Sequence, residues 1–397
     1  MEKDFLKISE SESDFEKKIE LVTENMEELN ISKVNRIKIK EYKDYYDENM
    51  GSTDSDFIKT KKCLEIISKL DWKRTLKEEK INISKMREFL NKKHYGMEKV
   101  KETILESLAL RYYMRNSGEK MPMIICLAGS AGIGKTSIAE AVSEALGREF
   151  EKISMSSVTT VFELTGLTKG YTSAAPGRII KTLAKFGCDD PLILLDEIDK
   201  VNQKKSEGDI EGVLLEILDP DQNKRFRDEF LELEYDLSNV MFLATANNLS
   251  EVSEPLKSRM EIIYLEDYNL EQKVEIAKNY IVPSINKKIG SKLFFSDDIL
   301  KYVIQNYTNE AGVRKLKTIL MKIYGRIAKE WLEKKKKVNV TLENIDSLIC
   351  ADKNPSISLK VNTEKSKIGE VMGMGVTSLG GRVMPIQTAV MPGDGKI

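Results

Sequence analysis

The sequence predicts an α/β fold in which a doubly wound parallel sheet is followed by a small all-α domain. Three short apolar runs, at 124–128, 192–195 and 241–244, are separated by segments with helical periodicity. Strands that are apolar on both faces and alternate with helices are typical of a parallel sheet covered on both sides. Beyond Asp267, apolar residues recur every three or four positions, most clearly from Val313 to Trp331, and this spacing indicates helices.

The segments on either side of this pattern differ from it. Residues 1–80 are rich in Lys and Glu and carry apolar residues at helical spacing from Phe15 to Leu29, which predicts a helical preface. From Ile368 onward, seven glycines lie among alternating apolar residues, which predicts short β-strands and turns. The predicted domains are therefore a helical preface at 1–80, the α/β domain at 81–266, the helical domain at 267–352 and a β segment at 353–397.

Composition and charge exclude several classes of protein. Of the 397 residues, 41% are hydrophobic and 32% charged, as expected for a soluble globular chain. The net charge of -1 gives no overall attraction to nucleic acid or to an anionic membrane surface. The apolar runs are far shorter than the roughly 20 residues of a membrane-spanning helix, and residues 1–20 lack the apolar core of a secretory signal. We therefore expect a cytoplasmic protein that does not engage a membrane, with its four scattered cysteines as reduced thiols.

A phosphate-binding loop of the form G-x-x-x-x-G-K-[ST] lies between a predicted strand and a predicted helix. Such a loop curls so that its N–H groups and the helix N-terminus converge on phosphate oxygens. Lys135 is expected to neutralise the terminal phosphates of ATP, and Thr136 to hold magnesium. The alternative is a glycine-rich turn followed by chance by Lys-Thr. The predicted nucleotide-binding residues are Gly129, Ser130, Ala131, Gly132, Ile133, Gly134, Lys135 and Thr136.

Polar side chains follow two further predicted strands. Asp196 and Glu197 come directly after the run 192–195, and Asn247 follows the run 241–244. Because ligands bind at the carboxyl edge of such sheets, we expect Asp196 to orient Mg²⁺ and Glu197 to activate the water that attacks the γ-phosphate. Asn247 would position that water. Taken alone, the acid pair also suits the first turn of a helix and Asn247 an ordinary turn, but with the phosphate loop they favour an ATP-hydrolysing protein.

Five segments, in the same order along the chain, resemble the Lon protease family. They are KHYGMEKVK at 93–101, APGRII at 175–180, LLEILDP at 214–220, PLKSRME at 255–261 and EAGVR at 310–314. The resemblance is strong from about Trp72 to Lys337 and continues into 368–397. It implies an AAA+ module, in which a phosphate-loop domain with a parallel sheet is followed by an α-helical lid domain and preceded by a helical linker. It also implies a homo-oligomeric ring, a hexamer in this family, that hydrolyses MgATP and pulls unfolded or misfolded protein through a pore.

The resemblance also assigns roles to four residues of these segments, beyond the phosphate loop, the acid pair and Asn247. Tyr95 and Gly96 resemble the segment that packs on adenine, although a core tyrosine at a helix start is an almost equally simple interpretation. Arg259 resembles the arginine finger that reaches the γ-phosphate of a neighbouring subunit, and Arg314 resembles the sensor arginine of the lid. Both arginines are also compatible with surface ion pairs, which are common in proteins.

The sequence departs from the family's pattern in three places. Tyr171 resembles the aromatic residue that grips substrate in the pore, but Thr172 and Ser173 follow it where the family usually has an aliphatic residue and glycine. A loop tyrosine without this role is the alternative. The family's globular N-terminal domain is not recognised ahead of the helical preface, and 368–397 resembles only the opening strands of the protease domain. We therefore expect a protein unfoldase and translocase, the motor of a Lon-like serine protease, with the Ser-Lys peptidase dyad absent from this chain.

Two other functions are compatible with these motifs. A stand-alone AAA+ ATPase that remodels its partners without proteolysis would carry the same phosphate loop, acid pair and arginines. A nucleic-acid motor is favoured only by the basic run 334–337, which is more typical of a solvated helix end.

Overall fold

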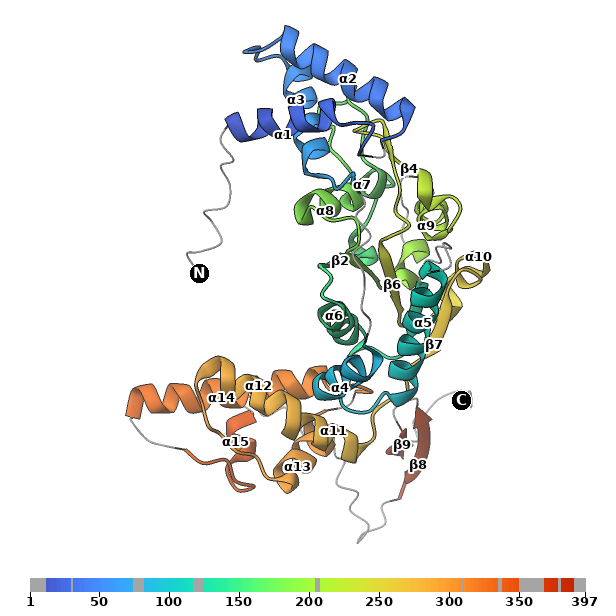
Figure 1. Cartoon of the computed structure of the whole chain (residues 1–397). Coiled ribbons are helices and arrows are strands. Elements are labelled where there is room, and N and C mark those ends of the chain that lie inside the picture. Colours follow the sequence, from blue (N-terminus) through green and yellow to red (C-terminus); the bar gives the residue numbers. More distant parts are fainter. Residues whose placement is uncertain are drawn as a thin grey trace, which may run out of the picture. The chain divides into compact units, whose positions relative to one another are not determined.

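The computed structural model describes residues 12–29, 31–73, 82–116, 124–203, 208–308, 310–334, 338–349, 368–377 and 380–388 (Figure 1). These residues form two compact units. The first unit comprises Met1–Lys93, Met97–Gly129 and Lys135–Leu265. The second unit comprises His94–Gly96, Ser130–Gly134 and Glu266–Ile397. The phosphate loop is thus divided, and its middle residues belong to the second unit.

The preface contains three helices, α1 (Glu12–Glu24), α2 (Lys33–Glu48) and α3 (Ser55–Lys69). The hydroxyl of Ser32 caps α2 by accepting a hydrogen bond from the N–H of Asn35 at 3.2 Å. The apolar stripe predicted from Phe15 to Leu29 is buried. Its last members, Met26 and Leu29, lie in the turn after α1 rather than on the helix, so the stripe is longer than the helix that begins it.

The preface shares one hydrophobic core with the α/β part of the first unit. Polar contacts reinforce this packing. The Asn35 side chain exchanges two hydrogen bonds with the backbone of Glu234, at 2.7 and 3.1 Å, and the Tyr42 hydroxyl donates to the carbonyl of Leu231 at 3.0 Å. These hydrogen bonds satisfy polar groups of the backbone that would otherwise bond to water. The preface helices are therefore held in one specific position on the α/β part.

A five-stranded parallel sheet forms the centre of the first unit and confirms the predicted α/β class. Its order is β2–β3–β6–β1–β7, with strands β1 (Ile124–Ala128), β2 (Phe150–Ser154), β3 (Leu192–Asp196), β6 (Met241–Ala246) and β7 (Glu261–Tyr264). The central strands β3, β6 and β1 are buried along their whole length and are those that the sequence predicts. The edge strands β2 and β7 mix polar with apolar residues, which is why no apolar run marks them.

Seven further helices precede β1 or lie between the strands in the described part of this unit. In chain order they are α4 (Ile83–Lys93), α5 (Glu98–Asn116), α6 (Lys135–Leu146), α7 (Phe162–Thr165), α8 (Arg178–Phe186), α9 (Ile210–Leu218) and α10 (Glu254–Lys257). Short 3-10 turns lie among them: η1 (Met155–Ser157), η2 (Ile198–Gln203), η3 (Asn223–Arg225) and η4 (Leu249–Glu251). The strands β4 (Phe226–Asp228) and β5 (Leu233–Tyr235) form a separate antiparallel pair. Helix α6, which follows the phosphate loop in the chain, packs on β2, β3 and β6.

The second unit is mainly helical. Its helices are α11 (Leu270–Ile276), the π-helical turn η5 (Ala277–Ile281), α12 (Val282–Ile289), α13 (Asp297–Tyr307), α14 (Arg314–Lys334) and α15 (Ile345–Ile349). A capping box between Asn269 and Gln272 starts α11. The stripe predicted from Val313 to Trp331 begins one residue before α14 and continues along this helix, where Leu316, Leu320 and Ile323 are buried in the core of the unit.

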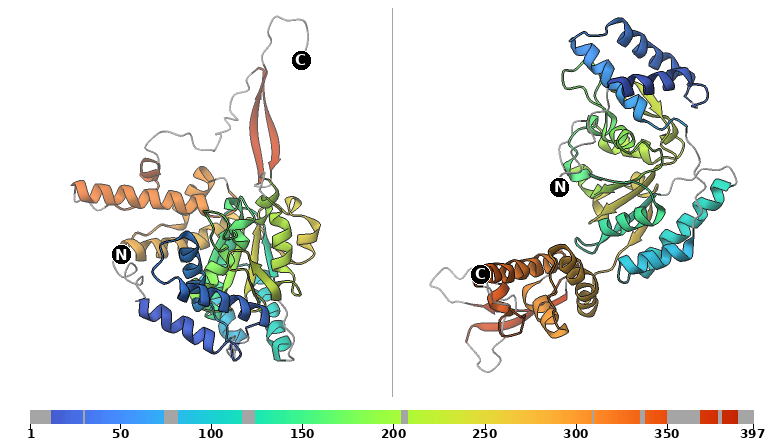
Figure 2. Two further views of the ribbon diagram at one scale, coloured as in Figure 1. Left: turned by 90° about the horizontal axis from the view of Figure 1, so that it is seen from above. Right: turned by 60° about the vertical axis from the view of Figure 1, so that its left-hand side comes forward.

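A β-hairpin follows near the end of the chain, where the sequence predicts strands and turns. Strands β8 (Glu370–Thr377) and β9 (Gly380–Gln387) pair antiparallel and are drawn in red in Figure 2. Within the ranges that the structure describes, no helix combines the length and the apolar character that crossing a membrane requires.

Candidate functional site

Several of the predicted site residues lie at the carboxyl ends of neighbouring strands of the parallel sheet. Asp196 ends β3, Asn247 follows β6, and Gly129 follows β1. Gly129 extends the β1 pairing by donating its N–H to the carbonyl of Ala246 at 3.1 Å. Since β3, β6 and β1 are neighbours and run in the same direction, residues far apart in sequence meet at their carboxyl ends.

Backbone geometry suits the phosphate loop to its predicted task. Gly132 and Gly134 have φ angles of 84° and 100°, in the left-handed region that glycine adopts at little cost. Helix α6 begins at Lys135 and runs for 12 residues, so its first turn presents N–H groups without partners in the helix. A helix start of this kind favours an anion.

Lys135 is held inside the site. Its side chain is buried, and its ammonium donates hydrogen bonds to the carbonyl of Gly129 at 2.5 Å and to Oδ1 of Asn247 at 2.8 Å. Burial lowers the pKa of Lys135, an effect that the nearby carboxylates of Asp196 and Glu197 oppose. Two residues that the sequence assigns to the γ-phosphate, Lys135 and Asn247, are therefore in direct contact.

Two hydroxyl groups lie beside the Asp196 carboxylate. The Thr136 hydroxyl lies 3.4 Å from Oδ1 of Asp196, and the Thr245 hydroxyl donates to the same oxygen at 2.6 Å. Burial raises the pKa of Asp196, but the ammonium of Lys152, at 2.5 Å from Oδ2, and the two hydroxyls outweigh it, so that the pKa lies below its usual value. Mg²⁺ in nucleotide sites takes one or two carboxylates or hydroxyls together with phosphate and water. Thr136 and Asp196 fit that ligand set.

Glu197 adopts an unusual backbone conformation. Its φ is 59°, which costs a residue with a Cβ about 1–2 kcal/mol. Its N–H donates to the Thr245 hydroxyl at 2.9 Å, and that hydroxyl in turn donates to Asp196. Thr245 thus holds both acids. Sequence reasoning missed Thr245 and Lys152. A threonine within the buried strand β6 is a polar exception that could have been noticed, whereas Lys152 gives no such signal, because β2 mixes polar with apolar residues.

The middle of the phosphate loop contacts the helical unit to which it belongs. The carbonyl of Gly132 accepts a hydrogen bond from the N–H of Val313 at 3.1 Å, and the carbonyl of Ile133 accepts one from the Tyr268 hydroxyl at 2.8 Å. Arg314 begins α14 at this point, and a Cβ added to Gly132 would lie 3.1 Å from the Arg314 Cβ. The predicted sensor arginine is therefore next to the loop, and Tyr268 is a contact that the sequence did not indicate.

Tyr95 also belongs to the second unit. It is partly buried and packs against the core of the lid helices, while Gly96 has a φ of 63°. This packing is what the alternative interpretation of Tyr95, a core tyrosine, describes. A role at adenine stays a prediction for both residues.

Two family models match the chain. Residues 125–268 match the ATPase family associated with various cellular activities (AAA), and residues 287–340 match the Lon protease AAA+ ATPase lid domain. Relatives named Lon protease include those of Clostridium acetobutylicum, 39% identical over 88% of this chain, and of Halothermothrix orenii, 38% identical over 84%. The relative from Malacoplasma penetrans is 40% identical over 82% of this chain. The chain spans 45%, 42% and 41% of these three proteins, somewhat less than half.

The chain is an AAA+ ATPase module of the Lon family. The fold and the ATPase class predicted from its phosphate loop and acid pair are confirmed.

Arg259 forms an ion pair within the Lon module. Its guanidinium contacts Oδ2 of Asp219 through Nη2 at 2.9 Å and through Nε at 3.3 Å. Asp219 follows α9, and backbone N–H groups together with Arg259 lower the pKa of its carboxyl. The surface ion pair considered from the sequence is thus present. A role across a subunit boundary stays a prediction.

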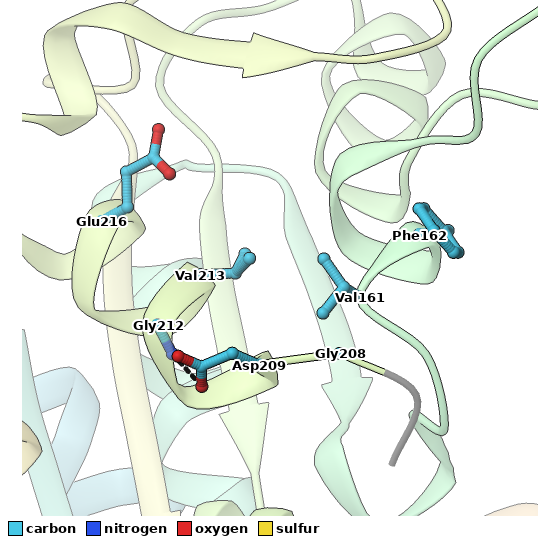
Figure 3. A pocket seen from close by; sticks show the side chains of 7 residues that line it. All are labelled: Val161, Phe162, Gly208, Asp209, Gly212, Val213 and Glu216. Carbon is cyan, nitrogen blue, oxygen red and sulfur yellow. Dashed lines mark hydrogen bonds between the residues drawn. The ribbon is translucent and has the colours of Figure 1, made fainter.

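Tyr171 is 61% exposed on the loop between α7 and α8, which is compatible with contact to another molecule. A pocket of about 620 Å³ lies beside α7, lined by Val161, Phe162, Val213 and Glu216 among others (Figure 3). No predicted nucleotide or magnesium residue lines it. The side chains of the basic run 334–337, on which the nucleic-acid alternative depends, fall outside those that the structure describes.

Substitution of Thr245 by valine is expected to slow ATP turnover about tenfold, because the Glu197 N–H loses its acceptor and Asp196 loses a donor. Valine keeps the shape of threonine, so the affinity for ATP should change little. Steady-state phosphate release checks the first expectation and a nucleotide titration the second. Thr245→Ser retains the hydroxyl and is the matched control. Wild-type turnover in Thr245→Val would show that the hydroxyl bridge has no part in hydrolysis.

Proposed function

We propose that this chain is the motor of a Lon-type ATP-dependent protease, which unfolds protein substrates and translocates them with the energy of MgATP hydrolysis. The observation that carries the proposal is the cluster at the sheet edge, where Lys135 meets Asn247 and Thr136 meets Asp196, in a chain whose lid matches the Lon lid model. The cluster supports ATP chemistry, and the lid supports this family over other AAA+ ATPases.

Nucleotide binding is assigned to the phosphate loop, residues 129–136. Its N–H groups and the α6 N-terminus would bind phosphate oxygens, and Lys135 would transfer its hydrogen bonds from Gly129 and Asn247 to the β- and γ-phosphates. Arg314, which lies against Gly132, is proposed as the sensor of the bound phosphates. Tyr95 and Gly96 are proposed for adenine.

Magnesium would be held by the Thr136 hydroxyl and the Asp196 carboxylate. When bound, Mg²⁺ supplies positive charge that neutralises the phosphate oxygens during transfer. For Asp196 to serve it, the Lys152 ammonium at 2.5 Å has to move away from the carboxylate. Lys152 is 42% exposed and on a flexible stem, so this exchange needs no change in the backbone.

Hydrolysis is assigned to Glu197 and Asn247. The Glu197 carboxylate would accept a proton from the water that attacks the γ-phosphorus, while the Asn247 amide holds that water in line. The left-handed backbone of Glu197 is held by the hydrogen bond from its N–H to Thr245. Strained conformations of this kind are found at active sites, where the surrounding contacts over-determine them.

A homo-oligomeric ring, a hexamer in this family, would complete the site. Arg259 is proposed as the finger that reaches the nucleotide of the neighbouring subunit, after exchange of its Asp219 partner for phosphate. Polypeptide that is unfolded or misfolded would pass the exposed Tyr171. We propose the cytoplasm as the location of this activity, and we assign peptide hydrolysis to none of the described residues.

Arg259→Ala is expected to reduce ATP hydrolysis about 100-fold while the ATP affinity changes less than about threefold, because the arginine would act on a neighbour's transition state. Mixing Arg259→Ala with Lys135→Ala should then restore part of the turnover, since each mixed interface can combine an intact Lys135 with an intact Arg259. The matched control is Lys257→Ala, which removes a nearby cation paired with Glu254. If mixed rings form, as shown by labelled subunits, and no turnover returns, Arg259 acts only through Asp219.

The proposed motor function is tested by measuring the molar mass of the chain with and without ATP, together with ATP hydrolysis in the presence of an unfolded protein such as β-casein. A ring that forms with ATP and turnover that rises with β-casein are the expected results. A chain that stays monomeric with ATP, or a ring whose turnover is indifferent to unfolded protein, would contradict translocation.

A further inference from the structure

The loop that carries Tyr171 is anchored at its base. Gly177 donates its N–H to Oδ2 of Asp228 at 2.8 Å, and the N–H of Leu167 donates to the carbonyl of Ala175 at 2.9 Å, which closes the loop. Gly166 packs so closely on Asp228 that an added Cβ would lie 2.9 Å from the carboxylate oxygens. Both ends of the loop therefore rest on one buried side chain.

A second anchor lies close to the tip, two residues before Tyr171. The ammonium of Lys169 lies 3.3 Å from the centre of the Tyr42 ring, which is well within cation–π range. The Lys169 carbonyl accepts a hydrogen bond from the ammonium of Lys59 at 2.6 Å. Tyr42 is on α2 and Lys59 on α3, so both contacts tie the loop to the helical preface.

Several groups surround the ammonium of Lys169. Burial lowers the pKa of Lys169, and the side chains of Cys63 and Glu232 oppose this effect. The Tyr42 ring is itself fixed, because its hydroxyl donates to the carbonyl of Leu231 at 3.0 Å and lies 3.2 Å from Oε2 of Glu232. An ordinary surface lysine extends its charge into water and keeps its rotamer freedom. Here the charge is instead directed onto a fixed aromatic face.

We propose that Lys169 is a positioning residue for Tyr171, which it presents to polypeptide by fixing the loop tip to Tyr42 and Lys59 of the preface. The preface is thereby part of the substrate-engaging apparatus and not only a support for the sheet. This inference rests on the proposed translocation of protein. It adds that the grip of Tyr171 depends on α2 and α3.

The anchoring is tested first, by amide hydrogen exchange on the 397-residue chain. Lys169→Met keeps the length of the side chain and removes its charge. The N–H groups of Tyr171 and Ala174, which bond to the carbonyls of Thr168 and Tyr171, should then exchange about threefold to tenfold faster. The N–H of Gly177, held by Asp228, should keep its wild-type rate, which separates local loosening from general loss of stability.

Two further variants sharpen this measurement. Lys169→Arg should exchange at the wild-type rate, because guanidinium also stacks on aromatic faces. Lys185→Met removes an exposed lysine of α8 that pairs with Glu151 and should leave the loop unchanged. Unchanged exchange at Tyr171 in Lys169→Met, or equal loosening in Lys185→Met, would overturn the anchoring.

The functional consequence is tested by titrating β-casein against ATP hydrolysis. In Lys169→Met, the β-casein concentration for half-maximal stimulation should rise about threefold to tenfold with less than about a twofold change in turnover without β-casein. Lys169→Arg should restore the wild-type concentration. A loosened loop with unaltered stimulation would overturn the positioning role.

Tyr171→Ala separates this inference from the function on which it rests. Loss of stimulation in Tyr171→Ala, combined with wild-type stimulation in Lys169→Met, refutes the role of Lys169 alone. Full stimulation in Tyr171→Ala refutes the substrate role of Tyr171, and the positioning proposal falls with it. Weakened stimulation in both variants, with rescue by Lys169→Arg, supports both.

Discussion

Replacement of Lys135 by alanine is expected to lower the affinity of the chain for ATP by at least about 100-fold. The ammonium is buried, and it already donates two hydrogen bonds, to Gly129 and Asn247. On binding, these donors would turn to phosphate oxygens, and hydrogen bonds to a charged group contribute about 1.5–3 kcal/mol each. No other group in the loop replaces this countercharge.

Titration with a fluorescent ATP analogue measures the affinity of the Lys135→Ala variant. Its thermal unfolding midpoint should be compared with that of the wild type without nucleotide, because removal of Lys135 also frees the Gly129 carbonyl. The control Lys185→Ala lacks an exposed lysine and should bind normally. Binding of the analogue by Lys135→Ala within about threefold of wild type, in a folded protein, would refute the role of Lys135 at the phosphates.

Glu197→Gln is expected to bind ATP normally and to hydrolyse it about 100-fold to 1,000-fold more slowly. Glutamine has the shape of glutamate, so the left-handed backbone and the bond to Thr245 should persist. It lacks the base that accepts the proton of the attacking water, and such a group contributes about that factor to the rate.

Single-turnover phosphate release measures this chemical step directly. Glu254→Gln, at an exposed glutamate on α10, is the control and should retain wild-type release. A Glu197→Gln variant with an unchanged rate would exclude Glu197 as the base. Together with Lys135→Ala, the variant separates binding from chemistry, because one loses affinity and the other only turnover.

The central strands and the main motifs could be predicted because their signals are local. β3, β6 and β1 are buried on both faces, so each is a continuous apolar run, and the phosphate loop is a fixed spacing of glycines before Lys135. The edge strands β2 and β7 could not be found in this way. Each has one neighbour and partial exposure, which permits polar residues and removes the apolar run.

The site was predictable in part for the same reason. Lys135, Asp196 and Glu197 belong to short motifs, and the parallel sheet brings them to one edge. Thr245 and Lys152 belong to no recognisable motif. Each contacts Asp196 because its strand, β6 or β2, lies next to β3 in the sheet. Arg259 was placed in a motif, but only the structure pairs it with Asp219, 40 residues away.

By itself, the sequence determined that this chain is an α/β phosphate-loop ATPase with a helical lid, because helix periodicity, buried strands and loop chemistry are written within a few consecutive residues. Only the tertiary structure decided where the preface helices pack and which side chains they contact. Asn35 bonds to Glu234 across 199 positions, and Tyr42 receives Lys169 from a loop in another part of the chain. Contacts of this kind depend on which surfaces pack together. A single polar residue forms no periodic pattern in the sequence, so its distant partner cannot be predicted from it.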